Sequence, residues 1–151
     1  MLGSSDEVLC QAYDLAMLDL DGVVYVGGDA VPGAPEHLAA ARAAGMRLAF
    51  ITNNASRPPQ VVADHLRELG VEAGADDVVT SAQAAARVLV DRFGTGARVV
   101  CLGADGLREA LRAAGLSPVG VDEDAVAVAT GYGPDVRWGE LMRAAVRIRA
   151  G

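Results

Sequence analysis

Two carboxylates separated by a single residue, Asp19 and Asp21, are the side chains of this sequence best suited to chemistry. They follow a short apolar run, residues 15–18, and precede Gly22. One carboxylate can attack phosphorus as a nucleophile, while the other gives up and takes back a proton. Carboxylate oxygens are also the ligands that Mg²⁺ prefers in proteins. Such a pair is also common in turns and calcium-binding loops, so by itself it permits phosphoryl chemistry, with Asp19 as nucleophile and Asp21 as acid and base, without requiring it.

A second polar cluster, residues 52–56, follows another apolar run, residues 46–51. The hydroxyl of Thr52 and the backbone N–H of Asn53 can both donate to phosphoryl oxygens, although neither carries a charge. Fixed donors of this kind stabilise a phosphoryl group without a basic side chain. Asn54 comes next in the chain, where an asparagine often completes a turn.

The elements that must position these residues are predicted from the apolar periodicity. Residues 15–18 and 46–51 have the length and composition of buried parallel strands, and residues 35–44 between them indicate a helix that stops at Gly45. Such a strand, helix, strand unit has a right-handed crossover that commonly makes its two strands neighbours. We therefore expect both polar clusters at the carboxyl edge of one sheet, where ligands bind in open α/β folds. Paired glycines predict a hairpin over residues 23–31.

The rest of the chain repeats the alternation of strands and helices. Residues 1–5 have the composition of a loose tail. Gly103-Ala104-Asp105-Gly106 is interpreted as a strand-to-helix turn capped by Asp105 rather than a nucleotide-binding loop, because it lacks the full glycine spacing. The predicted fold class is α/β, with a Rossmann-like parallel core over residues 1–79 and a second α/β subdomain over residues 80–151. Its further elements are helices over residues 60–69, 81–93 (capped by Thr80 or Ser81), 105–114 and 136–149, and strands over 76–79, 98–102 and 125–129.

Composition narrows the classes of partner. The chain has 151 residues, 52% of them hydrophobic, so it can bury a sizeable core. Its net charge is −7, and it has thirteen arginines but no lysine, which disfavours nucleic acid as a partner. No apolar run is long enough to span a membrane. The two cysteines have no metal-ligand spacing, and with no secretory segment they favour a reduced, cytoplasmic setting.

Residues 19–25, Asp-Leu-Asp-Gly-Val-Val-Tyr, and residues 52–56, Thr-Asn-Asn-Ala-Ser, resemble the first two motifs of haloacid dehalogenase-like (HAD) phosphatases. Within them they resemble the nitrophenylphosphatase-like class, in which a large cap is inserted after the second motif. Residues 79–82 and 141–151 are similar to the cap of that class, so the likeness covers the whole chain. Among the members of that class, the sequence resembles the glycerol-phosphate phosphatases of actinobacteria.

The resemblance implies a role for each motif residue. Asp19 would be the nucleophile and a metal ligand, and Asp21 the acid/base and a second metal ligand through its carbonyl. Phosphate would be bound by Gly22, Thr52, Asn53 and Asn54. The implied cofactor is Mg²⁺, the intermediate an aspartyl phosphate, and the substrate a small phosphorylated metabolite such as glycerol phosphate. Pairing of caps into a homo-oligomer is a further implication.

The sequence departs from the family in its later motifs. The third motif is a lysine, which this chain lacks, and no Gly-Asp with a following acid stands near residue 151 to act as the fourth. We therefore expect an N-terminal portion with an incomplete cap, weakly active or inactive unless the C-terminal remainder is supplied. Two alternatives stay open: a non-catalytic regulatory or assembly module, and a phospho-accepting signalling domain. The second fits less well, because its acceptor aspartate would lie on a later strand and be accompanied by a lysine.

Overall fold

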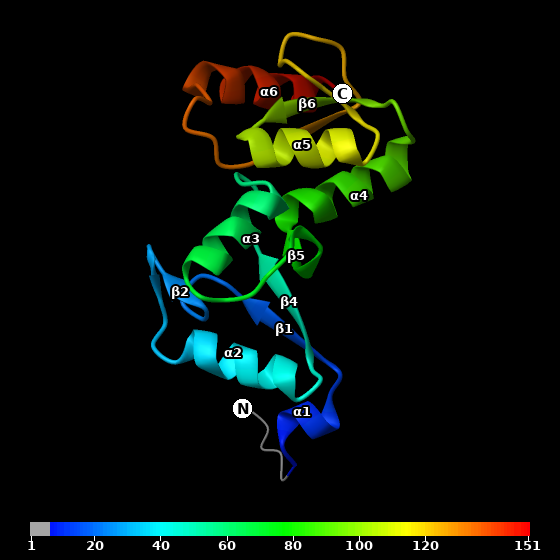
Figure 1. Cartoon of the computed structure of the whole chain (residues 1–151). Coiled ribbons are helices and arrows are strands. Elements are labelled where there is room, and N and C mark those ends of the chain that lie inside the picture. The colour runs from blue at the N-terminus through cyan, green and yellow to red at the C-terminus, as the bar shows by residue number, and fades with distance from the viewer. Residues whose placement is uncertain (1–6) are drawn as a thin grey trace. The chain divides into compact units, whose positions relative to one another are not determined.

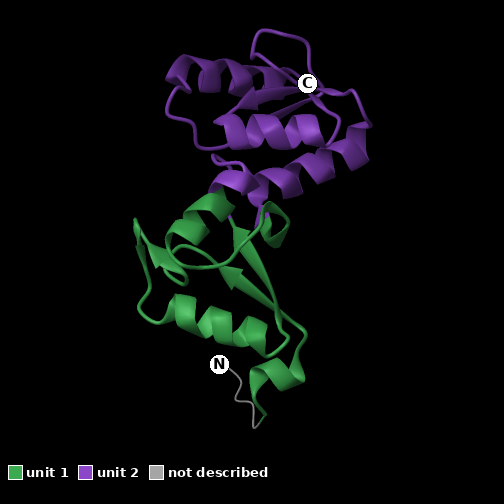
Figure 2. Ribbon diagram, in the orientation of Figure 1, with its two compact units in different colours: residues 1–52, 62–78 green, residues 53–61, 79–151 purple. Residues whose placement is uncertain are grey.

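The computed structural model describes residues 7–151, so the predicted tail at residues 1–5 lies outside the described part. The chain forms two compact units, coloured separately in Figure 2. Unit 1 contains the residues up to Thr52 together with Val62–Val78, and unit 2 contains Asn53–Val61 together with Val79–Gly151. Residues 53–61 therefore pack with the second half of the chain although they precede it in sequence. The interpretation of these units as core and cap stays a prediction.

Unit 1 is built on the predicted strand, helix, strand arrangement (Figure 1). Strands β1 and β4 pair in parallel, and the sheet order is β1-β4-β5. Helix α2 has Pro35 and Glu36 in its first turn and stops before Gly45, whose φ of +92° favours glycine. Its elements are α1 (Leu9–Ala12), β1 (Leu15–Asp19), β2 (Tyr25–Val26), β3 (Asp29–Ala30), α2 (Ala34–Ala43), β4 (Arg47–Thr52), α3 (Pro59–Glu68), the 3₁₀ helix η1 (Ala75–Asp77) and β5 (Val78–Thr80), of which α3 and β5 cross the boundary between units.

The sheet of unit 1 buries one face. Leu48 and Phe50 of β4 are buried and pack with helices α2 and α3 in a single apolar cluster. The other face carries Leu15 and Met17 of β1, which are 42% and 74% exposed. Alternation along a strand sends successive side chains to opposite faces, so the exposed pattern of β1 follows from its register. An apolar parallel strand is thus left half uncovered in the described residues.

Unit 2 holds a second parallel sheet in the order β7-β6-β8. Strand β7 was not predicted, because it is short and contains Pro118; as an edge strand it tolerates the missing N–H. Thr80 is the N-cap of α4 and exchanges hydrogen bonds with Gln83. The prediction that Asp105 caps α5 is wrong, since the N-cap is Ala104 and makes no side-chain bond. The elements are α4 (Ser81–Phe93), β6 (Arg98–Leu102), α5 (Asp105–Ala113), β7 (Ser117–Val119), β8 (Ala127–Thr130) and α6 (Trp138–Ala150).

Both faces of this second sheet are covered, because α5 and α6 lie on opposite sides of β6 (Figure 1). Val99 and Cys101 face one apolar cluster, which includes α4 and α5. Val100 and Leu102 face another, which includes α6. Strand β6 is consequently buried along almost its whole length, as expected for a central parallel strand.

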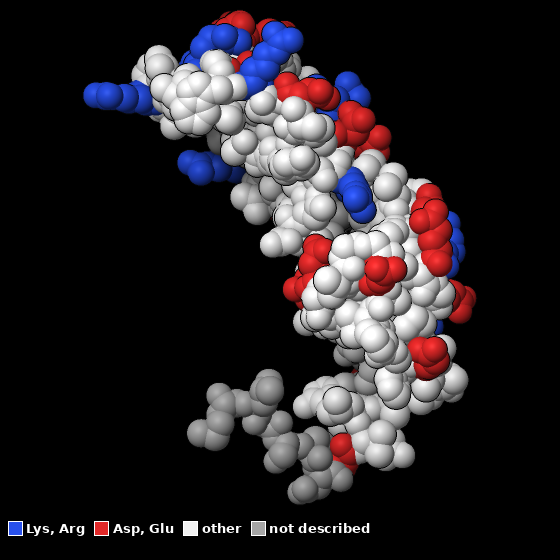
Figure 3. Space-filling model, turned by 90° about the vertical axis from the view of Figure 1, so that its left-hand side faces the viewer, with Lys and Arg blue, Asp and Glu red and all other residues white. Residues whose placement is uncertain are grey.

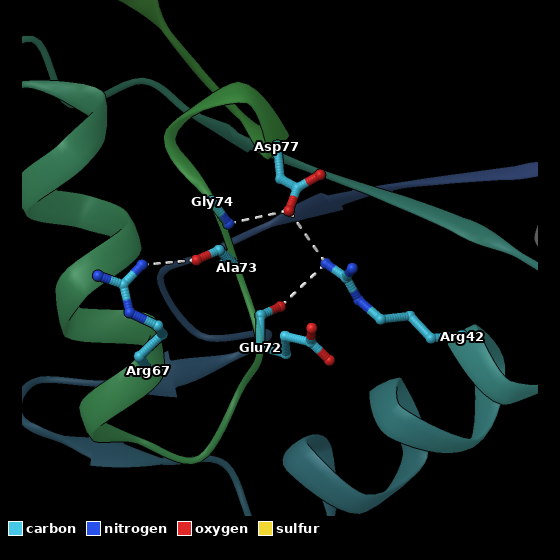
Figure 4. Close-up of polar contacts among 6 residues, drawn as sticks. All are labelled: Arg42, Arg67, Glu72, Ala73, Gly74 and Asp77. Carbon is cyan, nitrogen blue, oxygen red and sulfur yellow. Dashed lines mark hydrogen bonds and ion pairs between the residues drawn. The ribbon is translucent and has the colours of Figure 1, made fainter.

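Polar contacts tie down the segment that follows α3 in unit 1 (Figure 4). The Arg42 guanidinium donates to the carbonyl of Glu72 at 2.9 Å and to the Asp77 carboxylate at 3.2 Å. Asp77 also accepts the N–H of Gly74 at 2.9 Å. From α3, Arg67 donates to the carbonyl of Ala73 at 2.8 Å. These bonds fix the path of the chain into β5.

None of the helices within residues 7–151 combines the length and apolar character needed to cross a bilayer. On the face drawn in Figure 3, arginine side chains are interspersed with acidic ones and with uncharged surface.

Candidate active site

The two acids stand on an exposed turn at the end of β1. Asp19 is the last residue of the strand, and its carboxylate accepts the N–H of Leu20 at 2.8 Å. Leu20 and Val24 are buried, at 0% and 1% exposure, whereas Asp19 and Asp21 are exposed. The apolar side chains anchor the turn while the carboxylates face solvent. Both acids are therefore accessible to a ligand.

Gly22 shapes this turn. Its φ of +83° lies in the left-handed region that favours glycine, and its N–H donates to the carbonyl of Tyr25 at 2.8 Å. The carbonyl of Leu20 accepts the N–H groups of Val23, Val24 and Tyr25. The turn then enters the predicted hairpin, in which β2 and β3 pair antiparallel around Gly27 and Gly28. The hairpin prediction is confirmed.

The register of β1 and β4 brings the acids and Thr52 to one edge of the sheet. Asp19 lies opposite Ile51, so Thr52 is one residue further along the neighbouring strand. Paired residues share a face, and the next residue points to the other one. Asp19 is exposed on the face of Met17, while Thr52 is 3% exposed on the face of Phe50. A ligand that touches both must lie beyond the strand ends, at the edge.

The loop that follows Thr52, residues 53–57, belongs to unit 2. Within it, the Asn54 side-chain oxygen accepts both the N–H and the hydroxyl of Ser56, each at 2.7 Å. Such a bond to the residue two positions on is an Asx-turn. The carbonyl of Asn53 accepts the hydroxyl of Ser81 at 2.7 Å. The side chain of Asn54 thus takes part in holding the turn expected of an asparagine at this position.

The acid pair is suited to a magnesium site completed by water and substrate, and less suited to a metal site built from protein ligands alone. Among residues 7–151 no group of three or more His, Cys, Asp and Glu residues is placed to hold a metal. Mg²⁺ is usually held by one or two carboxylates together with water and substrate phosphate. Asp19 can supply one such carboxylate and Asp21 its backbone carbonyl oxygen, both on an exposed turn, so the donor set is compatible with Mg²⁺ binding.

Comparisons with known proteins agree with this geometry. The sequence profile of the haloacid dehalogenase-like hydrolases matches residues 16–117. A D-glycerol 3-phosphate phosphatase from Mycobacterium tuberculosis is 43% identical over 144 residues, covering 95% of this chain and 40% of that protein. An acid sugar phosphatase from Staphylococcus haemolyticus is 36% identical over 135 residues, covering 89% of this chain and 51% of that protein.

Comparison with solved structures also finds phosphatases. A crystal structure of glycerol phosphate phosphatase from Mycobacterium tuberculosis in complex with magnesium has a TM-score of 0.88 at 42% identity, covering 94% of this chain and 43% of that one. A 4-nitrophenylphosphatase from Thermotoga maritima has a TM-score of 0.84 at 29% identity, covering 96% of this chain and 54% of that one.

The chain belongs to the haloacid dehalogenase-like hydrolase family. The resemblance drawn from the two motifs and the α/β fold class are thereby confirmed. The chain spans about two fifths to one half of the length of the curated relatives described above. The activity and substrate of the whole protein are therefore matters of proposal.

Two residues that contact the 53–57 loop were not singled out as site residues from the sequence. Ser81 was interpreted as a helix cap and as part of the 79–82 stretch that resembles the cap of the family, and Gly106 as part of a strand-to-helix turn. The N–H of Gly106 donates to the carbonyl of Ser56 at 3.0 Å. Neither contact has a local sequence signal, because the partners are 28 or more positions apart.

Proposed function

We propose that this chain carries the nucleophile, the acid/base and the phosphate-binding loop of a Mg²⁺-dependent phosphomonoester hydrolase. The observation that carries the proposal is the parallel pairing of β1 with β4, because it brings Asp19, Asp21 and Thr52 to one sheet edge. The similar proteins described above are named as phosphatases, which supports the same reaction class.

In the proposed reaction, a carboxylate oxygen of Asp19 attacks phosphorus and the bond to the ester oxygen breaks. Asp21 gives its proton to the departing alkoxide. It then takes a proton from water, whose oxygen attacks the aspartyl phosphate, releases inorganic phosphate and restores Asp19. Bound Mg²⁺ would neutralise charge on the phosphoryl oxygens.

The phosphoryl oxygens would be held by uncharged donors. The Thr52 hydroxyl, the Asn53 N–H and the Asn54 amide are the proposed groups. We include Gly22 among them on the basis of the family resemblance, although its N–H donates to Tyr25 in this structure and its φ shows a role in the turn. Donors fixed before the ligand arrives cost no reorganisation during the reaction, which is the advantage of such a loop.

The proposed substrate is a small phosphorylated metabolite, with glycerol phosphate as the first candidate. The support is the mycobacterial relative at 43% identity, whose name specifies D-glycerol 3-phosphate. Comparing the kcat/KM of glycerol 3-phosphate with that of sugar phosphates tests the choice. A preference for sugar phosphates would favour the activity named for the staphylococcal relative instead.

Hydrolysis of nitrophenyl phosphate with Mg²⁺ tests the reaction. Where the chain hydrolyses the ester, alone or supplemented with the C-terminal remainder, we expect Asp19→Asn to lower the rate by about a thousandfold or more, since it removes the nucleophile. Asp14→Asn is the matched control, because Asp14 is an exposed acid just before the same strand. Hydrolysis that survives Asp19→Asn would reject the assignment.

The alternatives give other results in the same assay. A signalling domain would become stably phosphorylated on an aspartate of a later strand and release phosphate slowly. A regulatory or assembly module would neither hydrolyse the ester nor bind phosphate in a Mg²⁺-dependent way. If the isolated chain is inactive, restoration of hydrolysis by a separately supplied C-terminal piece would support the proposed incomplete phosphatase.

Assembly and location complete the proposal. We propose a homo-oligomer formed through unit 2, which light scattering of the purified chain tests. We also propose a cytoplasmic location, consistent with the free thiols of Cys10 and Cys101. Burial raises the pKa of the Cys101 thiol and so disfavours the reactive thiolate. Cell fractionation tests the location.

A further inference from the structure

The backbone of the 53–57 loop is held by two helices of unit 2, whose colour it shares in Figure 2. From the first residue of α4, the Ser81 hydroxyl donates to the carbonyl of Asn53 at 2.7 Å. From the second residue of α5, the N–H of Gly106 donates to the carbonyl of Ser56 at 3.0 Å. One helix therefore binds the start of the loop and the other binds its far side.

The absence of a side chain at Gly106 is what allows this approach. A Cβ atom there would lie 2.6 Å from the carbonyl carbon of Arg57, and 2.7 Å from both the Arg57 nitrogen and the Ala55 oxygen. All three are backbone atoms, so no side-chain rotation relieves the clash. A Cβ on Gly131 would lie 3.2 Å from that of Ala55. The loop is thus packed against backbone at the ends of β6 and β8.

Internal bonds complete the restraint. The Asn54 oxygen accepts two hydrogen bonds from Ser56, which closes the turn from inside. With Ser81 and Gly106 outside it, the loop is fixed at Asn53, at Ser56 and by contact at Ala55 and Arg57. Amide donors that receive phosphoryl oxygens gain most when their directions are set in advance.

We propose that Ser81 and Gly106 are positioning residues for phosphate binding, through which unit 2 holds the 53–57 loop in its phosphate-binding conformation. This inference rests on the proposed function. The restrained loop would contact the phosphoryl end of the ligand. Loss of the restraint should therefore lower the affinity for every phosphorylated ligand by a similar factor. If these residues instead selected the leaving group, their loss would change the order of affinities among phosphorylated substrates.

The first experiment compares two Gly→Ala substitutions at the same helical position. Gly106 is the second residue of α5 and Gly139 is the second residue of α6. Substitution by alanine therefore raises the helix propensity by the same amount at both positions. A Cβ on Gly139 meets only the flexible end of Arg143 at 3.8 Å. With inorganic phosphate and Mg²⁺ in calorimetry, we expect Gly106→Ala to bind about tenfold to a hundredfold more weakly. Gly139→Ala should stay within about twofold of the unsubstituted chain.

A second pair keeps the proposal testable if Gly106→Ala does not fold. Ser81→Ala removes one hydroxyl donor, and Ser81→Thr retains it. We expect Ser81→Ala to weaken phosphate binding by roughly tenfold, the size of one hydrogen bond, and Ser81→Thr to restore most of it. The affinities for glycerol 3-phosphate and nitrophenyl phosphate should fall by the same factor as the affinity for inorganic phosphate.

The outcomes separate this inference from the function on which it rests. Thr52→Val, in unit 1, reports on the proposed phosphate site itself. If Thr52→Val weakens phosphate binding while Ser81→Ala and Gly106→Ala do not, the positioning role is wrong and the proposed function stands. If phosphate binding is absent or unaffected by Thr52→Val, the proposed function fails and the positioning role fails with it.

Discussion

The two units contain similar sheets that use their strand ends differently. Each has three strands, and the parallel pairs β1-β4 and β6-β8 both end in turns rich in small or polar residues. In unit 1 the turn after β1 exposes Asp19 and Asp21. In unit 2 the turn after β6 leads directly into α5, whose second residue, Gly106, packs on the 53–57 loop. The same architectural position thus offers chemistry in one unit and close backbone packing in the other.

The sheets also differ in how much they bury. Strand β6 is covered on both faces, whereas β1 carries exposed Leu15 and Met17 on one face. Position at the carboxyl end of a parallel strand is therefore not enough to identify a catalytic site. Residue type, exposure and what covers the strand end must agree, as they do at β1.

The largest expected effect tests the difference in burial. Leu102→Ala in β6, where the side chain is 4% exposed, should lower the free energy of unfolding by about 2–5 kcal/mol. Met17→Ala in β1, at 74% exposure, should cost less than about 0.5 kcal/mol. Urea denaturation followed by circular dichroism measures both. A cost at Met17 similar to that at Leu102 would mean that this face of β1 is covered in solution.

The next effect tests the difference in chemistry. Thr52 and Thr130 are the last residues of β4 and β8, and Thr52 follows the residue that pairs with Asp19. We expect Thr52→Val to lower phosphatase activity by about a hundredfold, because one donor to the phosphoryl group is lost. Thr130→Val, at an exposed position, should leave activity unchanged. Equal losses in kcat/KM for the two variants would contradict the assignment of unit 1 as the catalytic side.

A smaller effect compares two acids paired with arginine. Asp77 accepts the Gly74 N–H and pairs with Arg42 in unit 1, while Asp122 pairs with Arg143 on the surface of unit 2. We expect Asp77→Ala to cost about 1–2 kcal/mol at pH 7, because a backbone N–H loses its acceptor. Asp122→Ala should cost less than about 1 kcal/mol, since exposed ion pairs contribute little.

The pH dependence of this difference has a definite sign. The Gly74 N–H and the Arg42 guanidinium hold the pKa of Asp77 below its usual value of 3.8, against the opposing effect of burial. The stabilisation is therefore complete above pH 3.8 and declines as the pH falls through the lowered pKa. Urea denaturation of the unsubstituted chain and Asp77→Ala between pH 7 and pH 2 measures it. A gap that widens on acidification would contradict this account.

Local patterns predicted the elements and the acid turn, but not the contacts between distant segments. The Asp19-Leu20-Asp21-Gly22 stretch combines an apolar run, two acids and a glycine, so its strand and turn could be predicted. The same patterns brought Thr52 to the edge of β1, which the register confirms. Whether these groups share one phosphate stays a prediction.

What could not be predicted depends on packing at long range. Residues 53–61 follow β4 in sequence, yet they pack with unit 2, because Gly106 and Ser81 bind the loop from 28 or more positions away. Strand β7 was missed because Pro118 is typical of turns and is tolerated only on an edge strand. A glycine needed for close approach has the same sequence signature as one needed for a turn, so Gly106 could not be distinguished.

The smallest effect compares two arginines on exposed helix surfaces. Arg87 pairs with Asp91 one turn along α4, and Arg67 pairs with Asp64 on α3. Arg67 also donates to the carbonyl of Ala73, so it ties the following segment to the helix (Figure 4). We expect Arg87→Met to cost about 0.3–0.5 kcal/mol and Arg67→Met about 1 kcal/mol, as an additional hydrogen bond is lost. Raising the salt concentration should remove a larger fraction of the cost at Arg87 than at Arg67, because the ion pairs are screened strongly and the hydrogen bond from Arg67 to Ala73 is not. If Arg67→Met costs no more than Arg87→Met at either salt concentration, the hydrogen bond to Ala73 contributes nothing to the stability of unit 1.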